Sequence, residues 1–562
     1  PLGQITGEGH GLFVLIDGEQ GAHELLGGVS RRPHGEREQQ HTRGRLIGLA
    51  LGALAVLGQA PFHFWPVTLI CLALLLARLQ WASGAKRQRR AGFSVGFWFA
   101  FGYFMAGTYW IGSAFIARGP EFIPVMPPMI IGLGVLLASF WGVAGAYFAK
   151  LKPSGVGAVF AFVSFFFLAE FARGHVLGGF PWNLPGYIFE GGGAISQLAS
   201  IMGVYGLTLL VFILSALIYL CLFTQKRLLP FIAAALIVGG SFGFGSLRLS
   251  KADISYVEGV KLRLVQVRFD QRDKFNPEKS VEIVNQFLTQ SVAPGIEDVT
   301  HLIWPEGAVN GLAIENEALL FAMGRELAAS TETPPIWLLN SLRNEQRPHP
   351  KTGVVIDDYF NTSAAVTFTA QGVPAIAAFN DKKRLVPFGE FIPGGKWMEM
   401  KNVPVISTSL LSISAAPKKY NAQFPGLPRL SPQICYEIIF SGFTPYPQGE
   451  ARPEWILNQS NDAWYGDSFG PLQHSNMATY RAIEEGLPVV RAAANGVTGV
   501  IDPYGRYTDS LGAKMTDNVD LNLPRPVNSR FFTKLINYLL LLINLLVALC
   551  YITVKVAKNQ RR

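Results

Sequence analysis

The chain has 562 residues, of which 49% are hydrophobic and only 15% are charged, and its formal net charge is +9. Because ordinary soluble domains carry about 25% charged residues, this composition excludes a wholly soluble protein and favours a membrane protein with a large polar part. The basic residues cluster between apolar runs, where they set membrane topology. The positive charge therefore does not indicate nucleic-acid binding, and we expect no nucleic-acid partner.

The N-terminal residues 1–44 are polar, rich in glycine and charge, and without periodicity, so we expect a disordered extension with no function. Residues 45–249 carry seven apolar runs that predict transmembrane helices, and residues 529–562 carry an eighth with a basic tail. The candidate spans lie near 46–60, 65–80, 92–116, 125–149, 156–173, 195–223, 229–247 and 531–556. Pro61 and Pro66 break the chain between the first two runs. We read two short spans and a tight turn there, with one re-entrant hairpin as the alternative.

Basic residues mark every second boundary between these spans. They precede the first span and follow the second, fourth, sixth and eighth: Arg43, Arg45, Lys86, Arg87, Arg89, Arg90, Lys150, Lys152, Lys226, Arg227, Lys555, Lys558, Arg561 and Arg562. Such loops face the cytoplasm. The long polar segment 250–528 follows the seventh span, so this pattern predicts a periplasmic domain in a multi-pass protein of the bacterial inner membrane, with both termini in the cytoplasm.

The polar segment alternates strand-like and helix-like stretches, which predicts an α/β layered domain. "VKLRLVQV" (260–267) is typical of a buried strand, and "PEKSVEIVNQFLTQSV" (277–292) has helical spacing. "THLIWPE", "PPIWLLNS", "YFNTSAAVTF", "LSPQICYE" and "PEWILNQSNDAWYG" predict further strands, and residues 470–486 predict a helix. The segment contains no Gly-rich phosphate loop after a strand and no metal-ligand spacing, so we expect neither a cofactor nor a metal.

Three polar residues stand at predicted strand ends, where α/β folds keep their chemistry. Glu306 ends "LIWPE", Lys382 opens "KKRLVPFGE", and Cys435 ends "LSPQIC". A carboxylate can take the proton of a thiol, and an ammonium can stabilise both a thiolate and an oxyanion. Together the three would form an acyl-transfer site.

Each of these residues also has an ordinary structural interpretation. A lone cysteine at a strand end is usually a small core residue, a glutamate after Trp-Pro is usually a loop charge, and a lysine in a pair is usually solvated. A Cys–His dyad that uses His474 is the rival catalytic hypothesis. Spacing alone leaves the choice open.

Seven sequence motifs resemble those of a known family, and this resemblance favours the catalytic interpretation. They are "LVQVRFDQRDKF" (264–275), "WPEGAVN" (304–310), "YFNTS" (359–363), "KKRLVPFGEFIP" (382–393), "ICYE" (434–437), "NQSNDAWYG" (458–466) and "RAAANGVTGVIDPYGR" (491–506). The polar segment resembles the nitrilase superfamily, which implies an αββα sandwich. With its flanking spans, the region of about 46–556 resembles the apolipoprotein N-acyltransferase family, whose membrane part has eight spans.

The resemblance implies a role for each matched residue. Glu306 would be the general base, Lys382 the triad lysine in preference to its neighbour Lys383, and Cys435 the nucleophile. The supporting positions that it implies are Glu390, Tyr436, Glu437 and Asn361. At Phe275 the family often has Trp; Phe keeps the apolar face but lacks the indole N–H, so it could not form any hydrogen bond that this group would donate.

The implied reaction is the last step of bacterial lipoprotein maturation. An acyl chain leaves a phospholipid, usually phosphatidylethanolamine, forms a thioester on the cysteine, and passes to the N-terminal amine of an S-diacylglyceryl-cysteine apolipoprotein. We expect a monomer that binds membrane lipid. A membrane-tethered amidase for a small soluble substrate is the alternative enzyme, but one span would suffice as its tether. A transporter is the non-enzyme alternative, for which Glu170 within a span is the main candidate residue.

Between Lys382 and Cys435, apolar residues alternate with many Gly, Pro and Ser. They are Phe391, Ile392, Trp397, Met398, Leu410 and Leu411. We expect mobile arms around the site here, with Trp397 or its neighbours near lipid.

Overall fold

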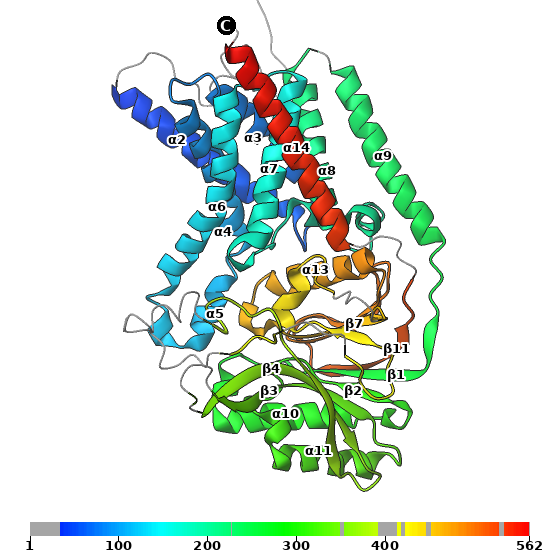
Figure 1. Cartoon of the computed structure of the whole chain (residues 1–562). Helices are drawn as coiled ribbons and strands as arrows, with labels where there is room; N and C mark the ends of the chain where they lie inside the picture. Colours follow the sequence, from blue (N-terminus) through cyan, green and yellow to red (C-terminus); the bar gives the residue numbers. More distant parts are fainter. Residues whose placement is uncertain are drawn as a thin grey trace, which may run out of the picture.

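The structure is a computed structural model that describes residues 34–225, 227–348, 353, 355–391, 413–417, 422–444, 451–527 and 533–560. It has two parts, a bundle of long helices and a sheet-rich domain at one end of that bundle (Figure 1). This arrangement confirms the predicted combination of a multi-pass helical part with an α/β domain. The expected arm residues, except Phe391, lie outside the described residues.

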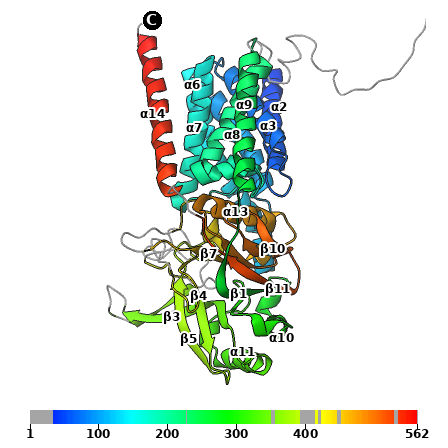
Figure 2. The same ribbon diagram turned by 90° about the vertical axis from the view of Figure 1, so that its right-hand side faces the viewer.

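The bundle is built from helices that come mainly from the N-terminal half of the chain. They are α2 (His34–Ala55), α3 (Trp65–Ala82), α4 (Gln88–Gly107), α5 (Ile111–Arg118), α6 (Met126–Leu151), α7 (Val156–His175), α8 (Ala199–Phe223) and α9 (Leu228–Ser250). The C-terminal α14 (Thr533–Gln560) returns to pack on α7 and α8. Figure 2 shows the long helices running roughly side by side, with the C-terminus at the end remote from the sheets.

Six helical stretches among the described residues are long and apolar enough to cross a membrane, judged by length and composition. They are Trp65–Ala82, Met126–Leu151, Val156–Gly178, Ile195–Phe223, Leu228–Ser250 and Thr533–Lys555. The helices α2 and α4, at the first and third expected spans, pack in the same bundle. Many apolar side chains of α9 and α14 point outward, among them Leu228, Leu236, Leu542 and Leu549. Such exposure is expected of helices that face lipid, which is as apolar as leucine.

Two expected boundaries differ from the structure. Helix α2 begins at His34, so the end of the segment 1–44 is helical rather than disordered, because its Glu, Gln and Arg residues are good helix formers. The run 92–116 divides into α4 and α5 around Trp110, whose ring packs 4.5 Å from that of Trp182 and 4.6 Å from that of Tyr465. Tertiary packing therefore interrupts a helix that hydropathy alone would continue.

The sheet-rich domain is a sandwich of two sheets. The first has the order β11-β1-β2-β3-β4-β5 and the second the order β10-β9-β8-β7-β6. The strands of the first sheet are β1 (Tyr256–Gln266), β2 (His301–Ile303), β3 (Ile336–Pro348), β4 (Val355–Phe368), β5 (Pro374–Asp381) and β11 (Asp517–Pro524). Those of the second are β6 (Leu430–Pro432), β7 (Trp455–Asn461), β8 (Val489–Ala494), β9 (Thr498–Ile501) and β10 (Tyr507–Leu511).

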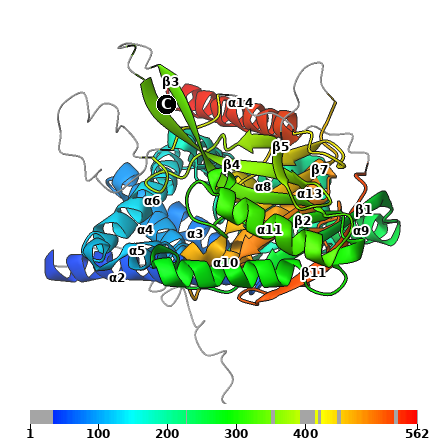
Figure 3. The same ribbon diagram turned by 90° about the horizontal axis from the view of Figure 1, so that it is seen from below.

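Helices cover the outer face of each sheet. Helices α10 (Pro277–Ser291) and α11 (Glu317–Ser330) lie on the first sheet, as the view from below shows (Figure 3). Helix α13 (Gly470–Glu485) lies between the second sheet and the bundle (Figure 1). The predicted αββα sandwich is confirmed, and α13 is almost wholly buried because it has the sheet on one side and the bundle on the other.

Three apolar clusters hold these layers together. One lies between the two sheets and includes Leu264 and Leu457, and another lies between the first sheet and its helices and includes Trp304 and Trp337. The third and largest joins α13 to the membrane helices without interruption. Because burial of apolar surface is the main favourable term in folding, this continuity binds the two parts into one unit.

Candidate active site

Cys435 stands in a strained turn directly after the short strand β6. Its φ of +47° is left-handed, a conformation that a residue other than glycine adopts rarely and that clusters at functional sites. The turn is held by Glu437, whose Oε2 accepts a hydrogen bond of 2.9 Å from the N–H of Ile434. The side chain of Cys435 is half-buried at the end of the strand. The fold thus places Cys435 in a turn after the strand, where part of it stays accessible.

Glu306 follows the strand β2 on the neighbouring sheet. Its Oε1 accepts a hydrogen bond of 2.8 Å from the side-chain amide of Asn361, and its Oε2 accepts one of 3.1 Å from the N–H of Asn461. These donors come from β4 and β7, so both sheets fix the carboxylate. The two hydrogen bonds fix the orientation of the Glu306 carboxylate, as a general base would require.

Lys382 follows β5, and its side chain is only 1% exposed. Its Nζ lies 2.9 Å from Oε1 of Glu390 and 3.7 Å from Oε1 of Glu306. The amide of Asn361 donates to Glu390 as well, at 2.9 Å, and Asn340 in turn donates to Asn361 at 2.7 Å. The structure therefore brings Glu306, Lys382, Glu390 and Asn361 into one network, as the motifs predict.

The charges of the site act on one another. Burial lowers the pKa of Lys382, but the carboxylates of Glu390 and Glu306 outweigh burial and raise it above its ordinary value. Burial raises the pKa of the Cys435 thiol, the charge of Glu306 raises it further, and Lys382 offsets only part of this. These directions favour an ammonium and a neutral thiol, and a neutral thiol would need a base in order to act as a nucleophile.

Lys383, the neighbouring candidate, points elsewhere. Its Nζ donates to the carbonyl oxygens of Ala416 and Pro417, at 2.6 Å each. Its backbone N–H and that of Arg384 both donate to Oε1 of Glu437 at 2.9 Å. Glu437 therefore ties the lysine loop to the cysteine turn, a bracing role that its place in "ICYE" did not reveal.

Tyr436 and Arg384 connect the site to the membrane part. The Tyr436 hydroxyl donates to the carbonyl oxygen of Gly179 at 3.0 Å, and Arg384 donates to that of Gly178 at 2.7 Å. Both glycines lie just beyond the end of α7 and have positive φ. The loops that carry Lys382 and Cys435 are therefore attached to the domain-facing end of the bundle.

Phe275 is the one predicted site residue that the structure leaves at the surface, with 62% of it exposed. Its neighbour Lys274 is buried instead and lies beside Gly307, directly after Glu306. Sequence reasoning missed Lys274, and it also missed Asn461 and Ser460, whose hydroxyl contacts Cys435. The motif "RDKF" contained the lysine, but a lysine in a polar loop is usually solvated.

His474, the rival base, is committed to another cluster. Its Nδ1 lies 3.0 Å from Oδ1 of Asp462, whose Oδ2 pairs with Arg491 at 2.6 Å. Burial lowers the pKa of His474 although Asp462 opposes this, and the ring lies near the backbone of Cys435. Among the described residues the ring forms no hydrogen bond with the thiol. Its position suits support of the turn better than deprotonation of the cysteine.

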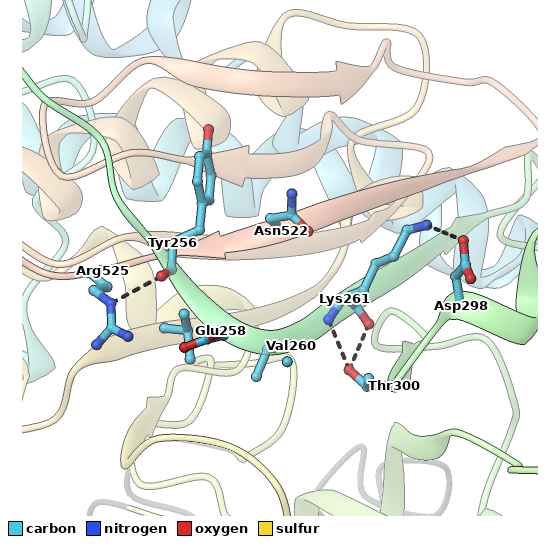
Figure 4. A pocket seen from close by; sticks show the side chains of 10 residues that line it. Tyr256, Glu258, Val260, Lys261, Asp298, Thr300, Asn522 and Arg525 are labelled. Atoms are coloured by element: carbon cyan, nitrogen blue, oxygen red, sulfur yellow. Dashed lines mark hydrogen bonds and ion pairs between the residues drawn. The ribbon is translucent and has the colours of Figure 1, made fainter.

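Two further features lie outside this network. Glu170 in α7 is fully buried and pairs with Arg173 at 2.5 Å, while Trp141 donates to it at 2.7 Å, so it is a paired structural charge. A hollow of about 530 Å³ opens at the start of β1 (Figure 4). Its lining includes the Lys261–Asp298 ion pair and none of the predicted site residues.

Comparison with known proteins identifies the family. Residues 51–217 match the model of the apolipoprotein N-acyltransferase N-terminal domain, and residues 279–519 match that of carbon-nitrogen hydrolases. An apolipoprotein N-acyltransferase of Rhodopseudomonas palustris is 34% identical over 501 residues, which cover 87% of this chain and 91% of the relative. The chain belongs to the apolipoprotein N-acyltransferase family. The predicted membership is thereby confirmed.

Other members of the family match over a similar extent. The apolipoprotein N-acyltransferase of Bradyrhizobium diazoefficiens is 34% identical over 502 residues, covering 87% of this chain and 91% of the relative. That of Caulobacter vibrioides is 32% identical over 489 residues, covering 86% and 89%. Both the membrane part and the sandwich domain are therefore shared with the family.

Proposed function

We propose that this chain N-acylates apolipoproteins through a thioester on Cys435, with phosphatidylethanolamine as acyl donor. The activity follows from membership of the apolipoprotein N-acyltransferase family, which also makes the enzyme an inner-membrane acyltransferase with lipoprotein and phospholipid substrates. The residue roles rest on one observation, the convergence of Glu306, Lys382 and Cys435 at the membrane-facing end of the sandwich. The choice of donor headgroup follows the family resemblance.

In the first half-reaction, Glu306 accepts the thiol proton as the sulfur of Cys435 attacks the ester carbon of the phospholipid. A tetrahedral oxyanion forms, and the Lys382 ammonium stabilises it together with backbone N–H groups. The ester C–O bond then breaks, and Glu306 returns its proton to the departing lysophospholipid oxygen. The products are an S-acyl cysteine and a lysophospholipid, and no redox change occurs.

In the second half-reaction, the lipoprotein amine attacks the thioester carbon. Glu306 takes a proton from the attacking nitrogen, the C–S bond breaks, and the sulfur recovers a proton from Glu306. The cysteine lets two substrates react in turn without being bound together, so the kinetics are expected to be ping-pong. A thioester suits this role because amines attack it more readily than an oxygen ester.

Both substrates are anchored in lipid, and the contacts of the site with the bundle fit that requirement. Leu177, next to the Gly178–Gly179 turn, is 76% exposed, and Phe388 in the lysine loop is 53% exposed. Apolar side chains exposed beside a bilayer surface favour lipid contact. The alternating basic loops support a periplasmic position for the sandwich domain, and we propose that the enzyme acts as a monomer.

The mechanism is tested by incubating the enzyme with phosphatidylethanolamine and no acceptor, followed by intact mass and peptide mapping. One acyl mass is expected on the peptide that contains Cys435, and neutral hydroxylamine should remove it. Cys435→Ala should abolish acylation, and Cys435→Ser should recover little of it, because a hydroxyl is far less acidic. Acylation that persists in Cys435→Ala, or a label on another residue, would contradict the thioester.

The orientation is tested separately with alkaline phosphatase fusions, which are active only outside the cytoplasm. A fusion after residue 255 should be active, and a fusion at the C-terminus should be inactive. The reverse pattern would refute a periplasmic domain without bearing on the thioester.

A further inference from the structure

Lys274 is a buried cation for which the mechanism so far has no use. Only 7% of it is exposed, and among the described residues its Nζ forms no ion pair and lies 5.8 Å from the centre of the Phe269 ring. Burying an ammonium without a carboxylate partner is costly, and proteins keep such groups where they serve a purpose. The charge of Glu306 opposes the effect of burial and raises the pKa of Lys274.

The geometry places this ammonium directly behind the base. Gly307 follows Glu306, and a Cβ built on Gly307 would lie 2.8 Å from Nζ of Lys274 and 2.6 Å from Nδ2 of Asn461. Asn461 also donates its backbone N–H to Glu306. The carbonyl oxygen of Lys274 accepts a hydrogen bond from Asn310. The segment 306–310 is thus held against Lys274 from both ends.

The charges of the site explain why a second cation is needed. Glu306 and Glu390 share a single ammonium, that of Lys382, and one amide, that of Asn361. The ammonium lies closer to Glu390, at 2.9 Å, than to Glu306, at 3.7 Å. The proposed base is therefore the less closely held of the two carboxylates, and a second positive charge on its other side would fix its position.

We propose that Lys274 is a positioning residue whose ammonium, packed behind Gly307, holds the Glu306 carboxylate in the place from which it deprotonates Cys435. The groups that face Glu306 are Lys382, Glu390, Asn361, Asn461 and Cys435. Lys382 is ion-paired with Glu390, whereas Lys274 forms no ion pair among the described residues and its charge is coupled to that of Glu306. The inference rests on the proposed function, because it assigns Glu306 as the base.

The charge of Lys274 depends on pH, so the effect of removing it should also depend on pH. Burial lowers the pKa of Lys274 to about 8, although the charge of Glu306 partly opposes this. The lysine is therefore charged at pH 6 and largely neutral well above pH 8. A substitution that removes its charge should matter at acidic pH and should matter little at alkaline pH.

The test compares the rate of Cys435 acylation by phosphatidylethanolamine in full-length wild type, Lys274→Met and Lys274→Arg. At pH 6 we expect Lys274→Met to be slower by about tenfold or more, the scale of one nearby opposite charge. At pH 9 its rate should approach that of the wild type. Lys274→Arg, which keeps the charge, should stay within about threefold of the wild type at both values.

Lys279→Met is the matched control. It removes a lysine five positions along, whose side chain is 53% exposed and pairs with Asp273 on the surface. It should leave the pH profile unchanged. A loss in Lys274→Met that is equal at pH 6 and pH 9, or a Lys274→Arg variant as slow as Lys274→Met, would assign Lys274 a merely structural role and overturn the proposal.

A second measurement does not depend on a Lys274 variant that folds. Trace labelling of amines with acetic anhydride, read by peptide mass, reports the pH at which Lys274 deprotonates in the wild type and in Glu306→Gln. We expect a lower midpoint in Glu306→Gln, and equal midpoints would overturn the coupling. If Glu306→Gln acylates at the wild-type rate, the proposed function itself fails; if it is inactive while Lys274→Met follows the wild-type profile, only the present inference fails.

Discussion

The ammonium of Lys382 lies 2.9 Å from Glu390 and 3.7 Å from Glu306, so the lysine is held more closely by the supporting carboxylate than by the proposed base. Glu390 is itself fixed, because its Oε2 accepts a hydrogen bond of 2.8 Å from the N–H of Val386. Glu390 therefore keeps Lys382 beside Glu306.

The first prediction concerns that arrangement. Glu390→Gln keeps the shape of the side chain but removes the charge that holds Lys382, so the ammonium should shift and lose its alignment with the oxyanion. We expect Cys435 acylation to fall by about 10²-fold, the scale for loss of one oxyanion donor. Glu345→Gln is the control, because it removes a half-exposed carboxylate that pairs with Arg343 in β3. Its acylation rate should stay near that of the wild type. A Glu390→Gln enzyme as active as this control would show that Lys382 needs no such anchor.

The second prediction uses two glycines that share a left-handed backbone. Gly307 has φ +79° and Gly311 has φ +72°, but a Cβ at Gly307 would collide with Lys274 and Asn461, whereas a Cβ at Gly311 would meet nothing within 4 Å. Alanine at either position carries the same backbone strain, about 1 kcal/mol. Gly307→Ala should in addition displace Glu306 and lower acylation by at least about tenfold relative to Gly311→Ala. Equal rates in the two variants would mean that the packing behind Glu306 is unimportant.

The third prediction concerns stability and pH. The pKa of Lys274 falls from 10.5 to about 8 on folding, so between these values the unfolded state binds more protons than the folded state. The stability contributed at this position is therefore present above about pH 10.5 and is lost as the pH falls towards 8. Lys274→Met removes the penalty, so its unfolding temperature in detergent should exceed that of the wild type at pH 7, and this gain should shrink towards pH 10. A gain that does not depend on pH would indicate better packing and not a buried charge.

The fourth prediction concerns the buried pair Glu170–Arg173 in α7. Both side chains are fully buried, and the guanidinium also donates to the carbonyl oxygens of Phe180 and Trp182. Removing one partner leaves the other charge buried and uncompensated, which typically costs 3–5 kcal/mol, about the range for soluble proteins. Glu170→Gln should therefore lower the unfolding temperature sharply, and Glu170→Gln with Arg173→Met should recover part of the loss. If Glu170 served transport instead, the single variant would stay stable.

The sequence predicts those parts of the site that stand next to strand ends in recognisable motifs. Glu306, Lys382 and Cys435 each follow a buried strand, and their convergence follows from the pairing of two sheets. Lys274 could not be predicted, because its burial depends on contacts with Gly307 and Asn310, which are distant in the chain. The break between α4 and α5 could not be predicted either, because Trp110 packs on aromatic rings from two segments that are distant in the chain.

For other residues, the sequence predicted a location at the site but did not predict the contacts that the side chain makes. Glu437 was expected near the triad, yet nothing in "ICYE" indicates that its carboxylate ties Lys383 and Arg384 to the cysteine turn. Phe275 was expected at the site because of the motif, but its side chain faces outward while the residue before it faces inward. A motif fixes which residues are close in the chain, whereas the direction of each side chain depends on the turn that carries it.

The turn at Gly178–Gly179 bears on which part of the chain is needed for activity. Its two carbonyl oxygens accept hydrogen bonds from Arg384 and Tyr436, so the loops that carry Lys382 and Cys435 contact backbone that belongs to the membrane part. A fragment that begins near residue 250 would keep Glu306, Lys382 and Cys435 but would lose the surface against which those loops are aligned. The end of α7 is in this sense part of the candidate site, and the smallest active fragment would have to include the membrane helices.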